Sequence, residues 1–124
     1  MTETPNPAVT ISVDLKKYRI RIYKSMLRLL GDPTYIQLLV NPDNKCVAIR
    51  GVEKAVPGDQ SEKIKPQRLM ADNSYELYSM SFVKKLISVV GNLEMNCSYR
   101  LTGNIVSSHN MAVFSMNTLT RIEN

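Results

Sequence analysis

The feature that most limits the fold of this chain is an order of segments that occurs twice. In each half, alternating apolar and polar residues lead to a serine, a short apolar segment, a glycine, and two more alternating stretches joined by a polar turn. Alternation with period two is typical of strands with one buried face, and a glycine after an apolar segment is typical of a helix end. The order predicts two strand–helix–hairpin halves. The alternative is that this is a common local pattern, because the halves share few residues.

The first half is predicted to hold four strands and one helix. Alternation favours strands over 9–13, 18–23, 35–40 and 46–52. A helix is expected over 26–30, with Ser25 as its N-cap and Gly31 after its last turn. Between the last two strands, Pro42 lies among Asn and Asp residues, which favours a hairpin turn.

The second half is predicted to follow a polar connector. Residues 53–74 carry several charges and three turn-forming Pro or Gly residues, so they are expected to connect the halves, with a short strand near 68–70. Strands are then predicted over 75–78, 97–106 and 111–116. A helix capped by Ser79 or Ser81 is expected to run to about Val90, before Gly91.

Length and composition predict one α+β domain that is mostly β. The chain has 124 residues, 44% of them hydrophobic and 22% charged, which suffices for one core without disulfides or metal. The expected divisions are a flexible N-terminus 1–8, a first half 9–52, a connector 53–74, a second half 75–116 and a C-terminal tail 117–124. No signal peptide and no run of 18 apolar residues are present, so a cytoplasmic protein that does not enter a membrane is expected.

The net charge of the chain is concentrated in one window. Residues 14–28 contain six basic residues and one acid, a net charge of +5, which equals that of the whole chain. Within 17–22, apolar and basic residues alternate, so a strand here would have one apolar and one basic face. Such a face could bind the phosphates of a polyanion. The alternative is a solvated edge strand whose charges prevent aggregation.

The tyrosines beside this window, Tyr18, Tyr23 and Tyr35, have two interpretations as well. Aromatic rings next to cations are typical of proteins that stack single-stranded bases. Tyrosine is also common at half-buried positions of a sheet, where it serves packing alone.

Few residues point to catalysis or to a bound metal. The only histidine, His109, lies in a polar turn, the acids are scattered singly, and no glycine-rich phosphate loop is present. Cys46 and Cys97 are expected to be reduced and buried, since two cysteines and one histidine cannot complete a four-ligand zinc site. We expect no enzyme, no cofactor and no metal. An enzyme whose residues meet only in the fold is a third alternative.

One segment resembles a known family. The sequence RIYKSMLRLLG at 21–31, followed by the hairpin strands YIQLLV at 35–40 and CVAI at 46–49, resembles the AbrB-like swapped-hairpin DNA-binding domains. The resemblance implies two strand–helix–hairpin units in one interleaved barrel, formed across a homodimer or, as in MraZ-like members, within one chain. It also implies a basic strand and loop, here Lys17, Arg19, Arg21 and Lys24, that face the DNA backbone and major groove.

Charge and resemblance together predict a DNA-binding transcription regulator of double-stranded DNA. The residues expected to contact phosphates or bases are Lys17, Arg19, Arg21, Lys24 and Arg28. The alternative is a non-enzymatic interaction or ligand-binding module in which the basic strand is only an exposed edge.

Overall fold

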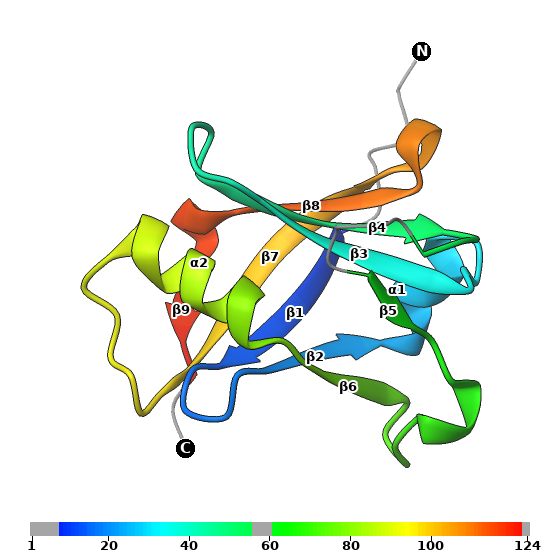
Figure 1. Ribbon diagram of the computed structural model, residues 1–124, viewed down its shortest axis with the longest axis horizontal. Coiled ribbons are helices and arrows are strands. Elements are labelled where there is room, and N and C mark those ends of the chain that lie inside the picture. Colours follow the sequence, from blue (N-terminus) through cyan, green and yellow to red (C-terminus); the bar gives the residue numbers. More distant parts are fainter. Residues whose placement is uncertain (1–7, 56–60, 123–124) are drawn as a thin grey trace.

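The computed structural model describes residues 8–55 and 61–122 and contains one nine-stranded sheet that curls into a nearly closed barrel (Figure 1). The strands are β1 (Ala8–Asp14), β2 (Arg19–Tyr23), β3 (Tyr35–Asn41), β4 (Cys46–Val52), β5 (Ser61–Lys63), β6 (Ser74–Tyr78), β7 (Ser98–Val106), β8 (Met111–Ser115) and β9 (Thr120–Arg121). The α-helices of the described ranges are α1 (Lys24–Leu29) and α2 (Met80–Val90). Short 3-10 turns occupy Pro66–Arg68, Ser107–His109 and Met116–Thr118. The predicted α+β class, mostly β, is confirmed.

The strand–helix–hairpin order occurs twice. The first unit is β2-α1-β3-β4 and the second is β6-α2-β7-β8. The strand order in the sheet is β5-β3-β4-β8-β7-β1-β2-β6, with β9 added beside β7. The two hairpins join through β4 and β8, and the two leading strands join through β2 and β6, all antiparallel. The two halves therefore meet through strands that hold equivalent places in each unit, β2 with β6 and β4 with β8. The middle pair of the five-pair β2–β6 ladder is Arg21 with Glu76.

The two sides of the barrel are closed by different means. On one side the seven-residue β1 pairs with both β2 and β7. On the other side β5 pairs with β3, and β5 and β6 end the strand order without pairing to each other. Here the buried Tyr75 hydroxyl accepts a hydrogen bond from the Lys65 N–H at 3.0 Å and donates one to the Lys63 carbonyl at 3.4 Å. The Tyr75 side chain thus links β6 to the end of β5, where the two strands do not pair.

The core is mostly aliphatic, and most of it comes from the inward positions of the alternating strands. Its members from β1 and β2 are Val9, Ile11, Val13, Ile20 and Ile22, and α2 adds Phe82, Val83 and Leu86. Gly103 allows β7 and β8 to approach closely, because a Cβ atom there would lie 2.0 Å from the Val113 carbonyl oxygen. The burial of every second residue in β1 and β2 confirms the alternation predicted for these two strands.

The two helix ends follow the sequence signals unequally. Of the two predicted caps of α2, Ser79 is the one used, since its Oγ accepts from the Phe82 N–H at 3.3 Å. Gly31 follows α1 with a φ of +84°, the conformation that glycine adopts without strain. The prediction that Ser25 caps α1 is wrong. The helix begins at Lys24 directly after β2, with Tyr23 at the N-cap and no side-chain cap bond.

The connector and the chain ends carry more structure than predicted. The expected strand near 68–70 is wrong, because backbone bonds from Arg68 to Lys65 and from Asn73 to Met70 close turns there. The strand of this segment is β5 instead. Residues 1–7 lie outside the described residues, but Ala8, which we assigned to a flexible end, opens β1. The C-terminal tail contains a 3-10 turn and β9.

Cys46 and Cys97 form no disulfide within the described residues, and both are only half-buried. Cys46 opens β4 and Cys97 immediately precedes β7, so both lie at strand ends where the core no longer covers them fully. The expectation that both are buried is therefore wrong. Across the described ranges, no helix has the length and apolar character needed to cross a membrane.

Candidate nucleic-acid interface

Strand β2 places the basic window on the outside of the barrel. Ile20 and Ile22 are fully buried, while Arg19 and Arg21 lie on the opposite face and are half-buried. The predicted strand with one apolar and one basic face is therefore present. What the basic face displays depends on the neighbouring strands.

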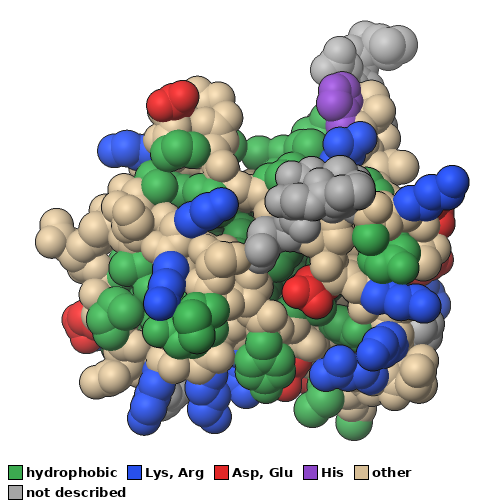
Figure 2. Space-filling view, in the orientation of Figure 1, with side chains coloured by type: hydrophobic (Ala, Val, Ile, Leu, Met, Phe, Trp, Pro, Cys, Tyr) green, Lys and Arg blue, Asp and Glu red, His purple; other side chains and the backbone are tan. Residues whose placement is uncertain are grey.

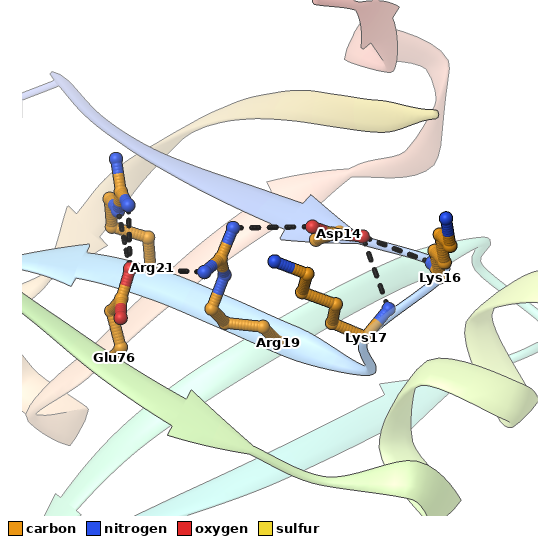
Figure 3. Close-up of polar contacts among 6 residues, drawn as sticks. All are labelled: Asp14, Lys16, Lys17, Arg19, Arg21 and Glu76. Atoms are coloured by element: carbon orange, nitrogen blue, oxygen red, sulfur yellow. Dashed lines mark hydrogen bonds and ion pairs between the residues drawn. The ribbon is translucent and has the colours of Figure 1, made fainter. Parts of the chain in front are cut away.

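Both arginines of β2 are paired with acids of adjacent strands (Figure 3). Arg19 lies between Asp14 of β1, at 3.2 Å, and Glu76 of β6, at 3.6 Å. Arg21 donates to the Oε2 atom of Glu76 from Nη2 at 2.5 Å and from Nε at 3.2 Å. The hydrogen bond to Glu76 raises the pKa of Arg21 above its usual value. We call Asp14, Arg19, Arg21 and Glu76 the ion-pair row.

The ion-pair row changes the charge that the window presents. Glu76 is distant in sequence from the window, but its side chain is only 16% exposed and lies against both guanidinium groups. The charge count over residues 14–28 did not include Glu76, because Glu76 lies in the second half and reaches Arg21 only through the pairing of β2 with β6. The positive charges of Arg19 and Arg21 are therefore largely neutralised by the carboxylates of Asp14 and Glu76.

The cations of the window that form no ion pair with a described residue lie at the two ends of β2. Lys16 and Lys17 occupy the β1–β2 turn and are exposed, and Asp14 Oδ1 shapes this turn by accepting both backbone N–H groups at 3.0 and 3.2 Å. Arg28 is exposed on α1, and Lys24 is half-buried at its start. None of these four cations forms an ion pair with a residue in 8–55 or 61–122. A five-residue strand places the two groups roughly 14 Å apart or more.

On the face shown in Figure 2, the basic residues do not gather into one continuous patch. The blue Lys and Arg side chains of Figure 2 are spread over the face shown there. Lys84 and Lys85 are exposed on α2, where they line a hollow with Val40 and Pro42 of the β3–β4 hairpin. Along the basic window, three groups follow one another: the lysine turn, which is the β1–β2 turn with Lys16 and Lys17, then the ion-pair row, and then Lys24 and Arg28 of α1.

One exposed aromatic ring accompanies this row. Tyr18 packs against the core, and Tyr23 and Tyr35 are half-buried, so packing accounts for them at least in part. Tyr78, at the end of β6, is 55% exposed. We did not single it out from the sequence. The available signal was the alternation in 75–78, which turns Tyr75 and Leu77 inward and therefore Tyr78 outward.

The described residues contain no constellation typical of a catalytic or metal site. No three His, Cys, Asp or Glu side chains of these ranges cluster as metal ligands. His109 is exposed in a turn and bonds to the neighbouring Ser108. An open groove of about 500 Å³ lies between α1, the loop after it and the β5–β6 connector, and its lining includes Leu27, Ile64 and Leu69.

Comparison with known proteins adds no assignment to this geometry. No protein-family model, no curated protein and no solved structure matches the chain.

Proposed function

We propose that this domain binds DNA through the phosphate backbone, using the cations at both ends of β2. The observation that carries the proposal is that Lys16, Lys17, Lys24 and Arg28 form no ion pair with a described residue, whereas the arginines between them do. Free cations on an ordered surface can neutralise phosphates and release counterions. Of the predicted contact residues, Lys17, Lys24 and Arg28 form the primary set, to which Lys16 is added.

Arg19 and Arg21 have a different part in the proposal. Their pairs with Asp14 and Glu76 tie β1, β2 and β6 together and so fix the strand that carries the other cations. Arg21 uses Nε and Nη2 for Glu76, which leaves Nη1 as a donor for a phosphate oxygen. We assign Arg21 a secondary contact and Arg19 a positioning role.

The wider role follows the resemblance to AbrB-like domains, which stays a prediction. On that basis the domain acts as a cytoplasmic transcription regulator, alone or as a homodimer, with double-stranded DNA as its partner. The two joined strand–helix–hairpin units are in keeping with this proposal.

The test compares two double variants of equal charge change. Lys16→Ala/Lys17→Ala removes the lysine turn, and Lys84→Ala/Lys85→Ala removes two exposed lysines from α2. Affinity for a mixed-sequence 20-mer is measured by fluorescence anisotropy from 50 to 200 mM salt, as duplex and as single strand. Loss of two phosphate contacts lowers the salt slope for duplex by about 1.8, while the α2 variant keeps the original slope.

Two outcomes would overturn the proposal. One is that the wild-type protein binds neither form of DNA at 50 mM salt. The other is that the two double variants lose affinity equally, since this would reflect overall charge and not a located surface.

The groove beside α1 favours a second candidate function, an interaction or ligand-binding module. Its apolar lining by Leu27, Pro33, Ile64 and Leu69 is flanked by Lys24 and Asp32. Under this candidate, Arg19→Ala/Arg21→Ala leaves partner binding unchanged while the fold persists, and Leu69→Asp abolishes it.

A further inference from the structure

The β1–β2 turn lies directly beside two exposed apolar side chains. Tyr78 pairs with Arg19 in the β2–β6 ladder, and the N–H of the next residue, Ser79, donates to the Tyr18 carbonyl at 3.0 Å. The junction of β6 and α2 is thereby held against the turn that carries Lys16 and Lys17. Tyr78 is 55% exposed and Met80, which opens α2, is 54% exposed.

The position of Tyr78 is not explained by packing of the core. Tyr75 and Leu77 of the same strand face inward and are buried, so the phenol ring of Tyr78 stands on the outer face. Its cross-strand neighbour Arg19 donates to Asp14 and lies against Glu76, and is thus engaged within the ion-pair row. Among the described residues Tyr78 is the most exposed large apolar side chain, and Met80 is nearly as exposed. Tyrosine is enriched at contact surfaces because it combines an apolar ring with a polar hydroxyl.

The chemistry around the ring indicates which partner fits. An aromatic ring next to the turn that carries Lys16 and Lys17, which form no ion pair with a described residue, matches a ligand that combines flat apolar rings with negative charge. A nucleotide chain has both properties. In a duplex the bases stack on one another and offer only their edges in the grooves. An unpaired base has a free face that can stack on tyrosine.

We infer that Tyr78 is a stacking platform for an unpaired base, and that the preferred ligand is single-stranded DNA whose phosphates bind Lys16 and Lys17. This inference rests on the proposed DNA-binding function and specifies the strand form, which differs from the duplex that the family resemblance implies. Met80 borders the platform and adds apolar contact to the base or the sugar.

The test uses Tyr78→Ala, with Tyr78→Phe as the variant that keeps the ring and Met95→Ala as a control at another exposed apolar side chain. The probes are a 12-nucleotide oligothymidylate and a 12-base-pair duplex. Loss of one base–aromatic stack lowers affinity for the single strand by roughly tenfold, with no change in the salt slope. Tyr78→Phe and Met95→Ala bind as the wild-type protein does, and the unfolding midpoint of each variant confirms the fold.

The outcomes separate the inference from the proposed function. The inference is overturned if Tyr78→Ala binds the single strand as the wild-type protein does, or if the duplex is bound more tightly and responds equally to the variant. Either result leaves the lysine contacts intact as a duplex site. Failure of the lysine-turn variant to change the salt slope would instead remove the proposed function itself.

Discussion

Replacing Glu76 by glutamine isolates the part that the ion-pair row plays in stability and in binding. Oε2 of Glu76 accepts from Arg21 at 2.5 and 3.2 Å and lies 3.6 Å from Nη1 of Arg19. Glutamine has nearly the same shape, so packing against β2 is kept while the negative charge is lost. Asp14 still holds Arg19 at 3.2 Å, so Arg21 is the residue that loses its counter-charge.

The structure gives magnitudes for both effects of Glu76→Gln. The Arg21 side chain is 36% exposed and that of Glu76 16%, so water screens the pair in part and its loss costs about 1 kcal/mol of unfolding free energy. For a chain of 124 residues this lowers the unfolding midpoint by about 4 °C. Release of one guanidinium adds one phosphate contact, which steepens the duplex salt slope by about 0.9.

The assay measures thermal unfolding by circular dichroism and DNA affinity by anisotropy on the same preparations. Under the proposed function, Glu76→Gln is less stable but binds more tightly at 50 mM salt, and its affinity falls about 3.5-fold more than that of the wild type between 50 and 200 mM. Glu62→Gln on β5 is the control, because it removes the same charge from a residue with no ion pair in the described ranges. Equal gains in both variants, or a weaker-binding Glu76→Gln, would refute the local-charge reasoning.

Two further predictions concern the scaffold. Gly103→Ala forces β7 and β8 apart, because the new Cβ would lie 2.0 Å from the Val113 carbonyl oxygen, and it should lower the free energy of unfolding in urea by about 3 kcal/mol. Gly31→Ala strains only the backbone at a positive φ and should lower it by about 1 kcal/mol. Equal losses in the two variants would contradict the packing argument. Hydrogen bonds from the Ser74 hydroxyl and N–H lower the pKa of Asp72. The stability that these bonds contribute is therefore present above the usual Asp pKa of about 4 and is lost as pH falls through the lowered value. Ser74→Ala should raise the Asp72 pKa in an NMR titration, and an unchanged pKa would contradict the assignment.

Local patterns predicted most of the strands, because alternation reports directly which residues face the core. Ile20 and Ile22 were assigned to the inner face of β2 from spacing alone, and both are fully buried. The prediction of the α1 cap was wrong because β2 leads directly into the helix. Tyr23 therefore occupies the N-cap position that the sequence pattern gives to Ser25. Such an abrupt transition leaves no turn signal in the sequence.

The candidate site was predicted less completely, since its chemistry depends on contacts between the halves. The positions of Arg19 and Arg21 on an outer face follow from alternation, but their neutralisation depends on Glu76, which the β2–β6 register places opposite Arg21. The same register puts Tyr78 opposite Arg19. Neither neighbour can be inferred from the charge window alone, because single-sequence patterns do not specify which strands pair.

The middle pair of the β2–β6 ladder also makes β2 a poor partner for a second β2. Arg21 meets Glu76 there, so each half supplies one sign of charge. If β2 of a second copy took the place of β6 in the same register, arginine would oppose arginine, and like charges directly across a ladder are destabilising. Two first halves are therefore disfavoured from pairing with each other through β2, and the charge pattern favours β6 as the neighbour of β2.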